Sequence, residues 1–320
     1  MPKPIAGTWF EFSHHNKPEG KYWNSAVRDF SDAQWEEKVG EIASLGMKYI
    51  VLMGSSLVYE NECGAYFKTD IYPFADMAAE DPIGALLRAA ERYDIKVFVS
   101  CGFYGPWTQT KENMISPDVR SRAFRAMEQL YDLYGHYRSF YGWYLPDELG
   151  INPYFTEEFI RYVNDYAAFG KSIRSSLKVL IAPYGTRRVI ADEKYVAQLE
   201  AMDCDYIAYQ DEVGVQKSVP EETAGYYEAL RKAHDKAGRS ALWADMEVFE
   251  FEGPVYESAL LPADFSRVKR QIKSLSPYVD EILIYQYEGM FNKPGTKAFC
   301  GHPDSERLYG DYLEFLKSGL

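Results

Sequence analysis

The feature that most constrains this chain is a regular alternation of strand-like and helix-like segments along its length. Eight short runs rich in β-branched and aromatic residues, each bounded by polar residues, glycine or proline, begin about 39 residues apart. The runs span residues 5–12, 48–54, 96–103, 140–145, 178–184, 205–210, 241–246 and 281–287. A step of this length holds one strand, one loop, one helix and a return loop, so the pattern predicts eight consecutive β/α units.

The segments between these runs have helical hydrophobic spacing and recognisable ends. Ser31 or Asp32 is a suitable N-cap for the first helix, which closes at Gly46. Asp81 and Pro82 supply a cap and a first-turn proline for the second helix. The predicted helices span residues 32–45, 82–93, 116–134, 156–173, 191–202, 220–237, 262–275 and 303–317.

Eight units in strict alternation, with no break in composition, predict an α/β fold: one closed (β/α)8 TIM barrel that occupies residues 1–320 as a single domain. An open doubly wound sheet is the alternative, but the GxGxxG turn expected after its first strand is absent. Four long connections, residues 13–31, 55–81, 104–115 and 247–262, each follow a predicted strand. They should therefore lie at the C-terminal face of the barrel, where barrel enzymes build their active sites.

Charge and hydropathy exclude several classes of partner. The chain has 35 Lys and Arg against 48 Asp and Glu, a net charge of −13, without a basic stretch, so we expect no nucleic-acid partner. The apolar stretches are too short for a membrane span, so we expect no membrane partner. No apolar signal-peptide core follows Met1, which makes the cytoplasm the default location, or the periplasm or exterior if a leader has been removed. The oligomeric state stays open.

Aromatic residues are unusually abundant, with 27 Tyr, 18 Phe and 6 Trp. Tyrosine and tryptophan carry a polar end that needs a partner, which favours a surface that stacks on flat ligands such as sugar rings, although a tyrosine-rich core is the alternative. The ring platforms and hydroxyl partners predicted on this basis are Trp9, Tyr104, Trp107, Trp143, Tyr209, Trp243 and Tyr285.

Five of the eight predicted strands end in carboxylates with an aromatic residue nearby. These carboxylates are Glu11, Asp147, Glu148, Asp211, Glu212, Asp245, Glu247 and Glu288. Clustered carboxylates are costly to place in a cleft and rarely serve stability. Hydrolysis of a glycosidic bond requires two of them, one as the acid and one as the base or nucleophile. We therefore predict a glycoside hydrolase with a carbohydrate partner and no cofactor, in which Glu148 is the general acid and Glu247 the nucleophile or base.

The remaining strand-end carboxylates, together with Gln210 and Gln286, are predicted to bind sugar hydroxyls. Asp245 and Glu250 compete with Glu247 for its role, and Asp211 or Glu212 is an alternative base of an inverting pair. Asp205 stands at the start of its run, which predicts a structural role at the opposite face.

Three strings carry a family resemblance: residues 142–148 (GWYLPDE), residues 209–214 (YQDEVG) and residues 247–249 (EVF). They resemble the glycoside-hydrolase-like barrels of domain-of-unknown-function family 4434 (DUF4434). More distantly, Glu148 after the fourth predicted strand and Glu247 after the seventh match the acid/base and nucleophile of clan A glycoside hydrolases. The resemblance implies a (β/α)8 fold and carbohydrate-related activity. In clan A an asparagine usually precedes the acid, whereas this chain has Asp147.

Two other functions remain open on the same barrel. His14, His15 and His302 follow the first and last predicted strands, and with Glu11 and Glu288 they could form the divalent metal site of a sugar isomerase, epimerase or lyase. No HxH or HExxH spacing supports such a site, so we predict that no metal is bound. The other alternative is a barrel that binds carbohydrate without catalysis.

Overall fold

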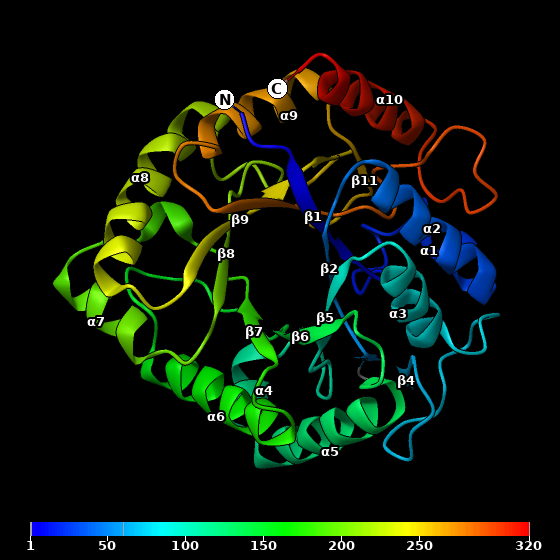
Figure 1. The fold of residues 1–320 in the computed structure, drawn as a ribbon, viewed down its shortest axis with the longest axis horizontal. Coiled ribbons are helices and arrows are strands. Elements are labelled where there is room, and N and C mark those ends of the chain that lie inside the picture. Colours follow the sequence, from blue (N-terminus) through cyan, green and yellow to red (C-terminus); the bar gives the residue numbers. More distant parts are fainter. Residues whose placement is uncertain (1, 60, 320) are drawn as a thin grey trace.

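The computed structural model describes residues 2–59 and 61–319, and its centre is a closed eight-stranded barrel. Its strands follow the order β1-β12-β9-β8-β7-β6-β5-β2, and every neighbouring pair is parallel (Figure 1). The strands are β1 (Ile5–Phe10), β2 (Tyr49–Leu52), β5 (Lys96–Ser100), β6 (Phe140–Leu145), β7 (Lys178–Ile181), β8 (Tyr206–Gln210), β9 (Ala241–Glu247) and β12 (Glu281–Tyr285). The predicted TIM barrel is confirmed.

A ring of helices surrounds the barrel (Figure 1). They are α2 (Asp32–Ser44), α3 (Pro82–Arg92), α5 (Pro117–Tyr134), α6 (Glu157–Ile173), α7 (Glu193–Ala201), α8 (Pro220–Ala237), α9 (Phe265–Leu275) and α10 (Asp304–Lys317). Side-chain caps begin several of them, because the Asp81, Ser116 and Thr156 side chains each accept a backbone N–H of the first turn. No helix in the described residues combines the length and apolar character needed to cross a membrane.

The long connections after the barrel strands contain short elements that the sequence pattern did not predict. These are α1 (Asn24–Arg28), α4 (Thr110–Ile115), the 3-10 turn η1 (Thr186–Arg188), and two antiparallel hairpins formed by β3 (Ser56–Val58) with β4 (Cys63–Ala65) and by β10 (Phe249–Phe251) with β11 (Leu260–Pro262). Such elements are too short to show a hydrophobic period in the sequence. As predicted, these connections follow strand ends.

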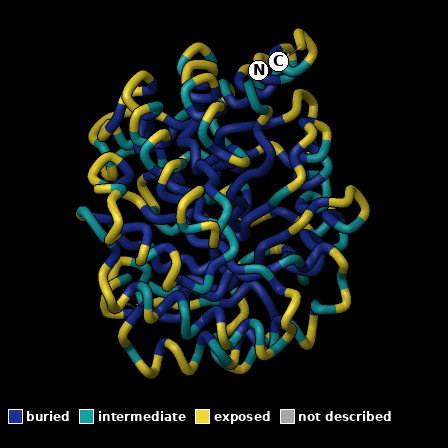
Figure 2. The backbone as a smooth tube through the Cα atoms, turned by 60° about the vertical axis from the view of Figure 1, so that its left-hand side comes forward, coloured by how far each residue is buried: buried dark blue, intermediate teal, exposed yellow. Residues whose placement is uncertain are grey.

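The interior of the barrel is closed at its N-terminal end by a layer of aromatic rings. Tyr206 and Trp243 lie 4.3 Å apart between ring centroids, and Tyr49, Phe98 and Tyr141 complete the layer. Figure 2 shows buried residues throughout the centre of the molecule and exposed ones mainly along its outer turns. The tyrosine-rich core that the composition allowed is therefore present, and the opening of the barrel lies at the other end.

Asp205 lies at the closed end, as expected. Its carboxylate accepts hydrogen bonds from the Val179 backbone N–H and the Lys178 ammonium at 3.0 and 2.9 Å, which ties the starts of two adjacent strands together. This contact is structural and is remote from the open face.

Candidate active site

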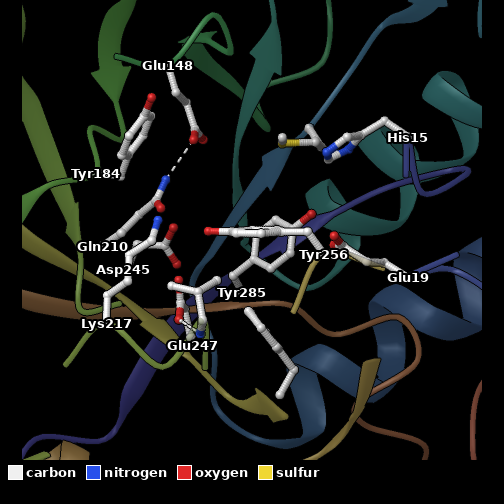
Figure 3. Close-up of a pocket in the computed structure, with 13 residues that line it drawn as sticks. His15, Glu19, Glu148, Tyr184, Gln210, Lys217, Asp245, Glu247, Tyr256 and Tyr285 are labelled. Carbon is white, nitrogen blue, oxygen red and sulfur yellow. Dashed lines mark hydrogen bonds between the residues drawn. The ribbon is translucent and has the colours of Figure 1, made fainter. Parts of the chain in front are cut away.

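A cavity of about 310 Å³ opens at the C-terminal face of the barrel. Three strands supply much of its wall: Gln210 ends β8, Asp245 and Glu247 belong to β9, and Tyr285 ends β12, while Glu148 follows β6 (Figure 3). The lining residues are His15, Glu19, Met53, Glu148, Tyr184, Gln210, Val215, Lys217, Asp245, Glu247, Phe249, Tyr256 and Tyr285. A volume of this size is at the lower end of the usual range for small-molecule sites.

Glu148 is held in a fixed position at one side of the cavity. The Tyr144 hydroxyl donates to Oε1 at 3.0 Å, and the Gln210 amide donates to Oε2 at 2.7 Å (Figure 3). Burial raises the pKa of Glu148 to about 7; the two hydrogen bonds oppose this shift and the neighbouring Asp147 carboxyl adds to it. Glu148 can therefore retain a proton close to neutral pH.

Glu247 lies at the end of β9, and Figure 3 shows it apart from Glu148 in the same cavity. The Val215 backbone N–H donates to its Oε2 at 2.8 Å. Burial raises the pKa of Glu247, and the negative charge of Asp211 raises it further. The end of β8 and the loop that follows it thus contact both glutamates, because Gln210 and Val215 are only five residues apart.

The peptide groups of Glu247 are held by three side chains behind the cavity, of which Asp211 and Gln271 are buried. Asp211 Oδ1 accepts the Glu247 N–H at 3.1 Å, and Asp211 Oδ2 accepts the Gln271 amide at 2.7 Å. Gln271 and Arg267 both donate to the Glu247 carbonyl, at 2.9 and 3.0 Å. Asp211 was predicted to contact substrate, but it lies outside the cavity lining and positions Glu247 instead.

Asp245 is two residues before Glu247 on the same face of β9, which places it deeper in the cavity. It is 2% exposed, and its Oδ1 atom has no hydrogen-bond partner among the described residues. Burial raises the pKa of Asp245 well above its usual range, and the charges of Glu148 and Glu247 add to this shift. A buried acceptor without a partner is unusual in a folded protein and is consistent with a group that waits for a ligand.

Several predicted ring platforms are not placed to contact a ligand in this cavity. Tyr209 points outward from β8, where its hydroxyl pairs with Tyr195 and His234 at 2.7 and 2.9 Å. Trp243 belongs to the aromatic layer at the closed end. Trp9 and Tyr104 are almost fully buried and absent from the cavity lining.

Trp143 also points away from the cavity, because β6 contains one extra residue. Val97 of β5 pairs with Phe140, whereas the next residue of β5, Phe98, pairs with Gly142. This irregularity changes which side chains face the barrel interior. Trp143 consequently packs against Gly170 of α6, where a Cβ atom would lie 2.7 Å from the indole ring.

Three more predicted binding residues lie behind or beside the cavity. Asp147 is buried against Asn113, which donates to its Oδ1 at 3.1 Å, and burial raises its pKa to about 7. Glu212 is 2% exposed and lies 3.9 Å from the Lys217 ammonium. Trp107 lines a separate cavity of about 400 Å³, with its ring edge-on to His15 at 4.7 Å between centroids.

Comparison of the sequence with models of protein families shows which family the chain belongs to. The model of the family described as "Domain of unknown function (DUF4434)" matches residues 5–298. This chain belongs to the DUF4434 family. The family resemblance noted in the sequence is thereby confirmed. No protein of curated function shows significant sequence similarity to the chain.

Solved structures similar to this DUF4434 member include several glycoside hydrolases. A Bacteroides thetaiotaomicron VPI-5482 protein, described provisionally as an alpha-L-fucosidase, has a TM-score of 0.77 at 17% identity, covering 99% of this chain and 94% of that one. The endo-beta-1,4-mannanase of Thermotoga petrophila has a TM-score of 0.62 at 10% identity, covering 100% and 78%. A GH5_18 variant from Streptomyces cattleya in complex with Manb1-4GlcNAc has a TM-score of 0.58 at 14% identity, covering 99% and 82%. At these identities the likeness is one of fold.

The DUF4434 barrel also contains a group of three potential metal ligands in its described residues: Glu11, His14 and His15. Both ring nitrogens of His14 are already engaged, with Glu11 Oε1 at 2.8 Å and with Glu19 Oε2 at 3.1 Å. Burial disfavours the charged form of His14, but the two carboxylates outweigh it and raise its pKa to about 9. To bind a metal ion, His14 would have to lose its proton and give up its contact with Glu11 or with Glu19.

The other members of the predicted metal group do not complete it. His302 is bonded locally, with Nδ1 3.4 Å from an Asp304 oxygen. Glu288 accepts the Glu11 backbone N–H at 3.3 Å, and the Gln286 amide donates to the Glu11 carboxylate at 2.7 Å. Glu11, Gln286 and Glu288 thus form a buried network beside the cavity and do not line it.

Sequence reasoning missed part of the cavity wall in this member of the family. Glu19, Tyr184, Lys217 and Tyr256 belong to loops that follow barrel strands, but none was singled out, and His15 was considered only as a metal ligand. Their position shortly after a strand was the available signal. Loop geometry selects which of many such residues reach the cavity, and that information is not local in sequence.

Proposed function

We propose that this protein is a glycoside hydrolase whose general acid is Glu148 and whose nucleophile or base is Glu247. The observation that carries the proposal is that two glutamates from non-adjacent strand ends line one cavity, and that burial raises the pKa of the proposed acid, Glu148, to about 7. Cleavage of a glycosidic bond needs a carboxylic acid and a carboxylate on either side of the bond. The likeness in fold to known glycoside hydrolases supports this reading.

In the proposed reaction Glu148 protonates the leaving glycosidic oxygen. Its hydrogen bonds from Tyr144 and Gln210 keep the carboxyl group oriented. A pKa of about 7 allows the acid to carry its proton and then to lose it without a large energetic cost. After bond cleavage the same group can accept a proton from water.

Glu247 acts at the anomeric carbon, either directly or through a water molecule. Val215 fixes Oε2 through its backbone N–H, which leaves Oε1 for the substrate. The deeper Asp245 and the Gln210 carbonyl oxygen can accept hydrogen bonds from sugar hydroxyls. The Tyr285 ring at the end of β12 offers an apolar surface to the sugar.

The test is sugar release from a broad panel of glycans and aryl glycosides by wild type and Glu148→Gln. We expect wild type to release sugar, and the variant to lose about 10²–10⁴-fold in kcat/KM on glycosides with poor leaving groups. Aryl glycosides with good leaving groups need little acid assistance and should lose much less. That dependence on the leaving group identifies an acid and would not follow from disturbed binding.

Glu281→Gln is the matched control, because Glu281 begins β12 at the opposite end of the barrel. This variant should hydrolyse the panel as wild type does. Absence of release from every glycoside by wild type would overturn the proposal. Binding of glycans without release would then favour a carbohydrate-binding barrel, whereas activity on free sugars that a chelator abolishes would favour the metal-dependent reading.

A further inference from the structure

Lys217 is the one lysine or arginine side chain among the described residues that line the active-site cavity. Figure 3 shows it extending toward Asp245 and Gln210. Its nearest ionic partner is Glu212 Oε1 at 3.9 Å, too far for a hydrogen bond. Burial lowers the pKa of Lys217, but the Tyr256 hydroxyl and the charges of Glu212 and Glu247 outweigh it and raise the pKa, so the ammonium stays charged.

Two tyrosine rings flank this ammonium group. The Lys217 Nζ atom lies 5.6 Å from the centroid of Tyr184 and 5.4 Å from that of Tyr256. Both tyrosines are at the cavity rim, 37% and 48% exposed. Cation–π contacts attract the charge without using its N–H donors. The lysine is therefore held in place with donors available to a ligand.

Left-handed backbone conformations at non-glycine residues are concentrated around Lys217. Glu212, Gln216 and Tyr256 have positive φ angles of 56°, 59° and 65°, and they are three of the four such non-glycine residues in the described chain. Glu212 is the ionic partner of Lys217, Gln216 precedes it, and Tyr256 flanks it. Left-handed conformations are unfavourable for residues with a Cβ atom and tend to gather at functional sites.

We propose that Lys217, between Tyr184 and Tyr256, binds a negatively charged substituent of the substrate, so that the cavity takes an acidic sugar that carries a carboxylate or a sulfate. The inference rests on the proposed function in that it assumes a sugar in this cavity. The Lys217 side chain is 35% exposed, so water reaches its ammonium group; a neutral sugar would displace that water without neutralising the charge, which is costly. An anionic group supplies charge-assisted hydrogen bonds and neutralises it.

The acidic residues of the cavity do not prevent an anionic substituent from binding at Lys217. Burial raises the pKa of Glu148 to about 7 and that of Asp245 well above its usual range. Both are therefore largely uncharged at mildly acidic pH, and burial raises the pKa of Glu247 as well. Glu212, 3.9 Å from the Lys217 ammonium, is the acidic group that shares this lysine with an incoming anion. The affinity for the anion should accordingly fall as the pH rises and these groups ionise.

The experiment measures binding apart from turnover, by calorimetry on Glu148→Gln protein. The ligands are methyl glycosides in the gluco, galacto and manno configurations, each as the neutral hexoside, the uronide and the 6-sulfate. We expect at least one uronide or 6-sulfate to bind about tenfold or more tightly than its neutral counterpart, and added KCl to reduce the difference. The uronide and sulfate arms identify which anion is preferred.

Lys217→Met in the same background removes the charge but keeps a chain that can pack between the tyrosines. It should equalise the affinities of each matched set, whereas Lys217→Arg should retain the preference. Lys194→Met is the control, because Lys194 makes a similar contact with Tyr154, 4.2 Å from its centroid, outside the cavity. The Lys194→Met variant should prefer anionic over neutral ligands as strongly as the Glu148→Gln protein does.

The inference is overturned if no anionic ligand binds more tightly than its neutral counterpart, or if Lys217→Met keeps the preference. This result is separable from the proposed function. Release of sugar from neutral glycosides by wild type, together with no tighter binding of any uronide or 6-sulfate, would leave a hydrolase and remove the acidic-sugar inference. Selective binding of anionic sugars without release from any glycoside would support the inference and remove the hydrolase.

Discussion

At the N-terminal end of the barrel interior the rings of Tyr206 and Trp243 lie 4.3 Å apart in a closed aromatic layer, whereas at the C-terminal end Glu148 and Glu247 line an open cavity. Both ends are built by the same eight strands. In β9 the change takes two steps along one face, from Trp243 through Asp245 to Glu247. One strand can thus serve packing at one end and chemistry at the other.

The two ends also differ in how well their polar groups are satisfied. In the closed layer the Tyr141 and Tyr206 hydroxyls pair at 2.7 Å. At the open end Asp245 Oδ1 has no partner among the described residues, and burial raises the pKa of each glutamate. Buried polar groups without a partner lower the free energy of unfolding. The open end is therefore arranged to bind a ligand, and this arrangement reduces the stability of the folded protein.

The largest expected effect separates the two ends by activity. Glu247→Gln should lower kcat/KM by more than about 10³-fold on any glycoside that wild type cleaves, because it removes the nucleophile or base. Folding raises the pKa of this carboxyl, so its ionisation in the folded state lowers the free energy of unfolding as the pH rises above its unfolded pKa. The neutral glutamine should therefore leave stability at pH 7 unchanged or increased in urea denaturation.

Asp205→Asn at the closed end is the reciprocal variant. It weakens the contacts with Val179 and Lys178, so it should lower the free energy of unfolding by about 1 kcal/mol while kcat/KM stays as in wild type. Loss of activity in Asp205→Asn, or retention of activity in Glu247→Gln, would contradict the division between the ends.

The next effect is on stability at the closed end. Trp243→Ala removes a 2% exposed indole from the aromatic layer and should lower the free energy of unfolding by about 3–5 kcal/mol, measured by urea denaturation. Trp243→Phe keeps most of the packing and should cost clearly less. If Trp243→Ala were as stable as wild type, the closed layer would not be the stabilising end of the barrel.

The smallest expected effect is a change in the pKa of Glu247 at the open end. Asp211→Asn removes the negative charge that raises the pKa of Glu247, but keeps an oxygen for the Glu247 N–H. The Gln271 Oε1 atom, which lacks a partner in the described chain, can turn to accept the new amide. Because the pKa of Glu247 should fall, the acidic limb of the profile of kcat/KM against pH should move to lower pH, by about one unit.

A merely structural role of Asp211 would reduce activity equally at all pH values and leave the profile in place. Asp147→Asn is the companion measurement, since Asp147 raises the pKa of Glu148 in the same way. It should move the alkaline limb of the profile to lower pH, because this limb reports the pKa of the acid Glu148. The double variant should show both limbs moved, each by the amount seen in its single variant, because each substitution acts on a different glutamate.

Much of the fold followed from local sequence signals. All eight barrel strands and the surrounding helices were predicted to within a few residues, because periodicity and helix caps are properties of neighbouring residues. The carboxylates Glu148, Asp245 and Glu247 were also predicted at the open end, since the end of a strand in a closed parallel barrel has a defined place. The family resemblance supplied their suggested roles.

The sequence by itself therefore determined the barrel, the face that carries the site and the residues from which the site is drawn. Only the tertiary structure decided which of those residues share the cavity. An extra residue in β6 turns Trp143 away from the cavity. The alternation of side chains along β8 points Tyr209 outward, where it contacts Tyr195 of α7. The conformation of the loop after β8 places Lys217 in the wall of the active-site cavity. The direction of a side chain depends on register and on contacts with residues far away in the chain, which no local pattern of residues encodes.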